Sequence, residues 1–123
     1  MGLRTLIVDD HEILGAGLAC MLAELGHEVL DIVGTGEEAI ESASRHKPDL
    51  IIMDVHLVGD MDGIAAATTI RQQLGIRSIF FSGYSDEDTR QRATAADPIA
   101  FLDKTASKEE LARIIGKAVP DVG

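Results

Sequence analysis

Five short apolar runs of strand length recur along the chain, and each is followed by a segment whose apolar residues fall at helical spacing. The runs cover residues 6–8, 29–33, 50–53, 79–81 and 99–102. Strands that alternate with helices are joined by right-handed crossovers, which gives a parallel sheet covered on both faces. The pattern therefore predicts an α/β fold, a three-layer, doubly wound (βα)5 sandwich with a five-stranded parallel sheet.

Helices are predicted between these runs from apolar stripes and from end signals. The predicted helical segments are residues 14–25, 37–45, 64–74, 86–96 and 111–118. Ser107 and Glu110 have the spacing of a capping box that starts the last helix. Gly26 and Gly75 follow apolar stripes and are expected to end the first and third helices. The fourth helix offers only alanines to a core, so we expect it to be mobile or reserved for a partner.

Length and composition limit the class of protein. The 123 residues, 46% of them hydrophobic, predict one domain over 1–123. A net charge of -10 with only 11 basic residues argues against direct nucleic-acid binding. Cys20, the only cysteine, lies in an apolar stretch, which predicts a packed thiol in a reducing cytoplasm. No run has the length of a membrane span or resembles a signal peptide, so we expect a soluble chain.

Polar residues follow four of the five apolar runs. Asp9 and Asp10 follow the first run, Asp54 the third, Ser82 the fourth and Lys104 the last. Open parallel sheets bind ligands at the carboxyl ends of their strands, beside the point where the strand order reverses. Grouped there, the acids could hold a divalent cation and accept a phosphoryl group, while the hydroxyl and the ammonium contact its oxygens. The spacing predicts a phosphate and metal site.

Four motifs in this order resemble one known family. They are LIVDD at 6–10, IIMD at 51–54, FFSG at 80–83 and AFLDK at 100–104. Each motif is weak alone, but their order and strand-end placement are specific. The chain closely resembles the receiver domain of two-component response regulators, the group that includes the chemotaxis regulators, over essentially its whole length. The resemblance implies the flavodoxin-like strand order 2-1-3-4-5.

The resemblance also implies a phosphotransfer site. Asp54 would be the phosphoacceptor for a histidine kinase or a histidine phosphotransfer protein, a role that suits a carboxylate nucleophile. Mg²⁺ would be held by Asp9, Asp10, Asp54 and the backbone carbonyl of His56. The phosphoryl group would be contacted by Ser82, Gly83 and Lys104.

Signalling would follow from the same resemblance. Ser82 and Phe101 match the switch residues of the family, which reshape the surface formed by the helix at 86–96, the strand at 99–102 and the last helix. That surface would contact an effector domain or a second copy of the chain. His56 and Tyr84 occupy positions that tune dephosphorylation. Such a domain catalyses only its own phosphorylation and dephosphorylation and is not otherwise an enzyme.

Several patterns in the sequence allow other functions. Residues 34–39 match the dinucleotide fingerprint, but Glu37 and Glu38 would sit where an anionic pyrophosphate must bind, so a tight turn is expected instead. An aspartate-nucleophile phosphatase would need a second acid where His56 stands. A receiver-like domain without phosphotransfer is the remaining alternative. The four histidines, His11, His27, His46 and His56, share no metal-ligand spacing, so zinc is not indicated.

Overall fold

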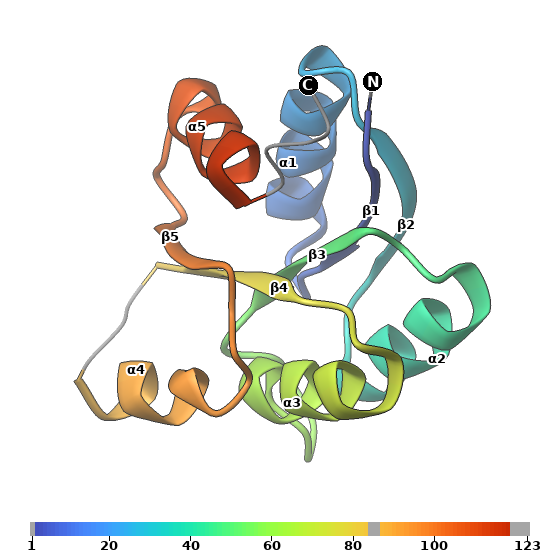
Figure 1. The fold of residues 1–123 in the computed structure, drawn as a ribbon, viewed down its shortest axis with the longest axis vertical. Coiled ribbons are helices and arrows are strands. Elements are labelled where there is room, and N and C mark those ends of the chain that lie inside the picture. The colour runs from blue at the N-terminus through green and yellow to red at the C-terminus, as the bar shows by residue number, and fades with distance from the viewer. Residues whose placement is uncertain (1, 84–86, 119–123) are drawn as a thin grey trace.

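A five-stranded parallel sheet lies between two layers of helices (Figure 1). The computed structural model describes residues 2–83 and 87–118. The strands are β1 (Arg4–Val8), β2 (Glu28–Val33), β3 (Leu50–Asp54), β4 (Ser78–Ser82) and β5 (Ala100–Asp103). Their order is β2-β1-β3-β4-β5 and all neighbouring pairs are parallel. The predicted doubly wound sandwich and its strand order are confirmed.

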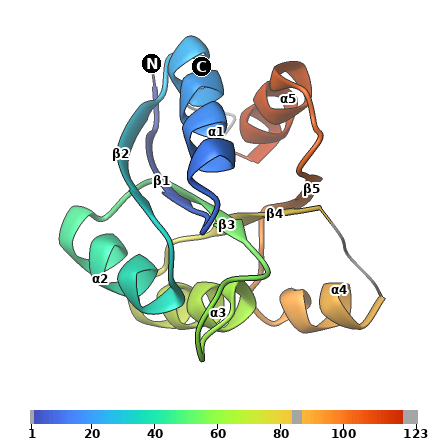
Figure 2. The ribbon, with the colours of Figure 1, turned by 180° about the vertical axis from the view of Figure 1, so that it is seen from behind.

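The helices divide between the two faces of the sheet. They are α1 (Glu12–Glu24), α2 (Gly36–His46), α3 (Gly63–Leu74), α4 (Glu87–Thr94) and α5 (Lys108–Ala118). Figures 1 and 2 show α1 and α5 on one face and α2, α3 and α4 on the other. Within the described residues, no helix combines the length and apolarity needed to cross a membrane.

Each face of the sheet has its own core, because successive side chains of a strand point to opposite faces. Leu6, Ile51 and Phe80 pack with α2, α3 and α4. The neighbouring residues Ile7 and Ile52 pack with α1 and α5. All five side chains are at most 1% exposed. Burial on both faces explains why the central strands β1, β3 and β4 appear in the sequence as continuous apolar runs and not as alternating ones, whereas the edge strand β2 is partly exposed and carries Asp31.

The residues predicted to begin or end helices do so in the structure. The hydroxyl of Ser107 accepts a hydrogen bond from the Glu110 amide at 3.1 Å, which caps α5. Gly26 and Gly75 have φ of 90° and 72°, the left-handed conformation that ends a helix and that glycine adopts without strain. Residues 34–35 form the expected tight connection from β2 to α2, in which Thr35 caps the helix, and residues 36–39 are the first turn of α2.

The apolar stripe predicted over residues 14–25 faces the sheet in α1, and only its first leucine departs from the prediction. Gly15, Leu18 and Leu22 are its buried residues, whereas Leu14 is 44% exposed. A Cβ atom at Gly15 would lie 3.2 Å from a methyl group of Ile32, so the missing side chain lets α1 approach the sheet on this line. Cys20 lies off that line and is exposed, so the prediction of a packed thiol was wrong.

Candidate functional site

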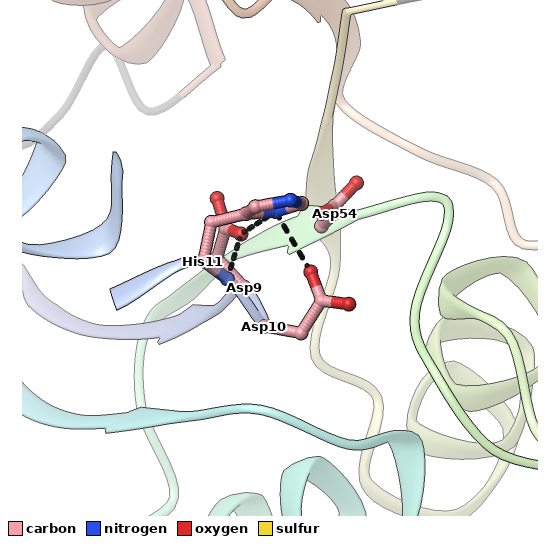
Figure 3. Close-up of side chains that lie close together, drawn as sticks. All are labelled: Asp9, Asp10, His11 and Asp54. Atoms are coloured by element: carbon pink, nitrogen blue, oxygen red, sulfur yellow. Dashed lines mark hydrogen bonds and ion pairs between the residues drawn. The ribbon is translucent and has the colours of Figure 1, made fainter. Parts of the chain in front are cut away.

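Three carboxylates converge where β1 and β3 end side by side. Asp9 and Asp10 directly follow β1, and Asp54 is the last residue of β3. The strand order reverses at β1, because the chain adds β2 on one side of β1 and then β3 on the other. Figure 3 shows the three side chains gathered at this edge. Asp9 and Asp54 are 5% and 2% exposed, so two negative groups are placed in a poorly solvated position.

Lys104 supplies the positive charge of the cluster. Its ammonium lies 2.9 Å from Oδ2 of Asp54 and 3.7 Å from Oδ2 of Asp9. The other oxygen of Asp54 accepts a hydrogen bond from the His56 amide at 3.2 Å. Burial raises the pKa of Asp54, the hydrogen bond and charge of Lys104 lower it, and the nearby Asp9 raises it again, with a net increase. Lys104 therefore offsets only part of the cost of burying this carboxylate.

Asp9 keeps one oxygen available for a further positive ligand. Its Oδ1 accepts a hydrogen bond from the His11 amide at 2.9 Å. Its Oδ2 is buried and accepts no hydrogen bond from the described residues. Ligand atoms of Asp9, Asp10, His11 and Asp54 all lie within 4.8 Å of one another. A hard divalent cation such as Mg²⁺ prefers carboxylate oxygens, and a buried oxygen that accepts no hydrogen bond is available to bind it.

The phosphate-contact candidates lie at the ends of the next two strands. Ser82 ends β4 and is 4% exposed, and Gly83 follows it. Lys104 follows β5, and its amide donates to the Ser82 carbonyl at 3.1 Å, which holds the two strand ends together. A Cβ atom at Gly83 would lie 3.7 Å from the Lys104 side chain. The structure thus brings the predicted phosphate contacts beside the predicted phosphoacceptor.

Phe101 is half-buried on the edge strand β5 and touches both the core and α4. Its ring lies 5.6 Å from that of Phe80, centroid to centroid. On the other side, the guanidinium of Arg90 lies 4.9 Å from the ring centroid of Phe101, at cation–π distance. The predicted switch aromatic is therefore in contact with the helix whose surface it is expected to change.

Residues 5–116 match the family model of the response regulator receiver domain. The chain belongs to this family. Among curated relatives, the transcriptional regulatory protein PdtaR of Mycobacterium tuberculosis is 39% identical over 116 residues, which cover 94% of this chain and 56% of PdtaR. The response regulator protein VraR of Staphylococcus aureus is 34% identical over 119 residues, 95% of this chain and 56% of VraR. The receiver domain thus spans about half the length of the curated relatives it matches.

Solved receiver domains share the fold. The signal receiver domain of a modulated diguanylate cyclase from Desulfovibrio desulfuricans has a TM-score of 0.92 and 31% identity, over 98% of this chain and 96% of that one. The receiver domain of the sensor histidine kinase PA1611 from Pseudomonas aeruginosa has a TM-score of 0.86 and 28% identity, over 98% and 99%. That structure has a magnesium ion coordinated in its active site cleft. The family match makes this chain a signalling receiver domain.

Two features of this receiver domain were not predicted from its sequence. His11 joins the acidic cluster, although the spacing of the histidines did not indicate a metal ligand. A depression of about 310 Å³ also adjoins Asp9 and Asp10, with Ile32 and Val58 among its lining residues. The adjacency of His11 to the acidic pair was the one signal for the first feature. His56 is exposed in the loop after β3, and Tyr84 lies outside the described residues.

Proposed function

We propose that this receiver domain accepts a phosphoryl group on Asp54 from a histidine kinase or a histidine phosphotransfer protein in the cytoplasm, with Mg²⁺ bound beside it. One observation carries the proposal. The ammonium of Lys104 lies 2.9 Å from a carboxylate that is only 2% exposed, at the strand ends where Asp9 also lies. A structural ion pair would not require Asp9 as a second buried carboxylate beside it.

The chain's own residues account for the transfer chemistry. A carboxylate oxygen of Asp54 attacks phosphorus, an oxygen–phosphorus bond forms, and the phosphorus–nitrogen bond of the donor phosphohistidine breaks with its electron pair leaving on the imidazole. The His56 amide and Lys104 fix the carboxylate before attack. Lys104, the Ser82 hydroxyl and the Gly83 amide then contact the oxygens of the phosphoryl group.

The metal-binding residues in this proposal are Asp9, Asp10, Asp54 and the backbone carbonyl of His56. The buried Oδ2 of Asp9, which accepts no hydrogen bond from the described residues, and the all-oxygen donor set fit Mg²⁺, which favours carboxylates, carbonyls and phosphate oxygens. When bound, the ion neutralises negative charge that builds up between the carboxylates and the incoming phosphoryl group. By holding the ion, Asp9 and Asp10 would offset the repulsion between the carboxylates and a phosphate that approaches Asp54.

The output would be carried by α4, β5 and α5. Movement of Ser82 toward the phosphoryl group and inward rotation of Phe101 would remove the aromatic ring from Arg90 and change the surface of α4. An effector domain, or a second copy of the chain, would bind that altered surface. The phosphodonor would meet the opposite side of the site, where Ile13, Ile32 and Val58 are 86%, 41% and 60% exposed.

Intact-mass spectrometry tests the proposal. The protein is incubated with phosphoramidate and Mg²⁺, and wild type is compared with Asp54→Ala and with Asp60→Ala, an exposed acid of the same loop. We expect one phosphoryl adduct in wild type and in the Asp60 variant, and none in the Asp54 variant. An adduct that survives in Asp54→Ala would show that the acceptor is another residue.

Two further assays, with a phosphate ester and with a phosphorylated kinase, separate the alternatives. A phosphatase would turn over an external phosphate ester without stoichiometric uptake. A receiver-like interaction domain would take up no phosphoryl group from the small donor or from a phosphorylated kinase. We favour the receiver activity because each position that it requires within the described residues is filled and gathered at one edge of the sheet.

The lifetime of the aspartyl phosphate is proposed to depend on His56 and Tyr84. His56 is exposed two residues after Asp54, where its side chain can restrict or guide an attacking water. The decay of the adduct is measured in wild type and in the His56→Ala, Tyr84→Ala double variant. Equal lifetimes in the two proteins would remove this role.

A further inference from the structure

The imidazole of His11 is directed at the acidic cluster and does not cap a helix. His11 is the N-cap residue of α1, a position whose side chain often accepts a hydrogen bond from the first turn, but it makes no such bond. Its Nδ1 instead lies 2.9 Å from Oδ1 of Asp10 and 3.4 Å from Oδ1 of Asp9. Figure 3 shows the ring beside both carboxylates, with Asp54 at its far side.

One of these separations already matches an edge of a metal coordination shell. Two ligands with bonds of about 2.1 Å are about 3.0 Å apart when they are adjacent in an octahedron. The 2.9 Å from His11 Nδ1 to Asp10 Oδ1 has this value, and the 3.4 Å to Asp9 Oδ1 would shorten slightly around the same ion. One ligand atom of each of Asp9, Asp10, His11 and Asp54 lies within 4.8 Å of the others, so a small movement of the exposed ring completes the set.

The two carboxylates have capacity for an ion. Oδ2 of Asp9 is buried and accepts no hydrogen bond from the described residues, and the Asp9 side chain is only 2% exposed. Oδ1 of Asp10 is also buried and accepts no hydrogen bond from the described residues, although His11 is close. His11 itself is 62% exposed, so its ring can adjust to an ion without disturbing the core. The ammonium of Lys104 lies 3.7 Å from Oδ2 of Asp9, whereas His11 lies beside Oδ1.

We propose that His11 Nδ1 is a direct ligand for borderline first-row cations such as Co²⁺, Ni²⁺ and Zn²⁺, together with the carboxylates of Asp9 and Asp10. Imidazole nitrogen favours these ions, whereas Mg²⁺ prefers oxygen ligands and retains water. His11 would therefore raise the affinity for transition ions without raising that for Mg²⁺. The inference rests on the proposed function, because these ions would compete for the position assigned there to Mg²⁺.

Two titrations test the assignment. Co²⁺ binding is followed by its visible absorption and by calorimetry, and Mg²⁺ binding by amide shifts in ¹H–¹⁵N spectra. The proteins are wild type, His11→Ala, and His46→Ala as a control for a histidine outside the cluster. We expect His11→Ala to weaken Co²⁺ at least about tenfold, the loss typical when a site loses a supporting ligand, and to change Mg²⁺ affinity less than about twofold. His46→Ala should leave both affinities unchanged.

A second measurement needs no substitution. In wild-type protein, Zn²⁺ should shift the Nδ1 resonance of His11 in a long-range ¹H–¹⁵N spectrum, while Mg²⁺ should leave it in place. Co²⁺ binding that is unchanged in His11→Ala, or equal losses of Co²⁺ and Mg²⁺ affinity, would overturn the inference and leave the proposed function standing. Failure of wild type to bind Mg²⁺ at all would count against the proposed function and, with it, against this inference.

Discussion

Lys104 compensates charge inside the site, so its replacement should destabilise the fold in a pH-dependent way. Lys104→Met keeps the length of the side chain and removes its charge. Breaking a fully buried ion pair by removing one partner costs about 3–5 kcal/mol. Lys104 is 15% exposed, which admits some water, so we expect a loss of about 2–3 kcal/mol in the free energy of unfolding near neutral pH without divalent ions.

Urea denaturation measures this loss. With a slope of about 1.5 kcal/mol per M, the midpoint should fall by about 1.3–2 M. Lys108→Met is the control, because Lys108 is 41% exposed and its ion pair with Glu24 spans 3.5 Å, so a change below about 1 kcal/mol is expected.

The pH dependence has a definite sign. Burial already raises the pKa of Asp54 above its unfolded value, and Lys104 opposes that rise, so the variant should have a still higher pKa. A raised carboxyl pKa stabilises the fold at low pH, and that contribution is lost as pH rises through the folded-state pKa. The deficit of Lys104→Met should therefore shrink in acidic buffer, and Asp54→Asn in the same protein should restore stability at neutral pH. A deficit that is absent at neutral pH, or independent of pH, would refute the reasoning.

The remaining predictions concern packing and capping, and all are read from urea midpoints. Gly63→Ala should lower the free energy of unfolding by at least about 2 kcal/mol, because its Cβ would overlap the backbone carbonyl of the last residue of β3. Gly17→Ala, with open space around it in α1, should raise it by about 0.5–1 kcal/mol. Asp62→Ala should cost about 1–2 kcal/mol, because it removes the cap of α3 and a 2.8 Å ion pair to α4, and Asp62→Asn should cost less because an amide can still cap. Ile70→Ala, at a site with no exposure, should cost about 2–5 kcal/mol, whereas Ile13→Ala, at 86% exposure, should stay within about 0.5 kcal/mol. Equal midpoints within any of these three pairs would contradict the corresponding structural assignment.

The central strands β1, β3 and β4 were predictable because they are buried on both faces and so appear as uninterrupted apolar runs. Asp54 could be placed at a strand end for the same reason, since Leu50–Asp54 is a run that stops at an acid. The packed face of α1 was not predictable in the same way. Leu14, Leu18 and Leu22 are equally apolar in the sequence, and the choice between them depends on how closely the helix can approach β2.

Site residues were predictable only where a strand end fixes them. Asp54 and Ser82 end strands, so their neighbours follow from the strand order alone. His11 lies beyond β1, where the backbone turns into α1, and the direction of its ring depends on the fit of one loop. Sequence spacing carries no information about that rotation.

The weak apolar anchoring of α4 has a consequence for the order in which parts of the molecule open. Of the described residues of α4, only Thr89 and Ala93 are buried, and Arg90 and Arg92 connect the helix to Phe101 and Asp62. Helices held mainly by polar contacts open by local unfolding at a lower free energy than core elements. Amide hydrogens of α4 should therefore exchange with solvent well before those of α3. The helix α4 can therefore unfold and refold locally while the sheet and the other four helices stay folded.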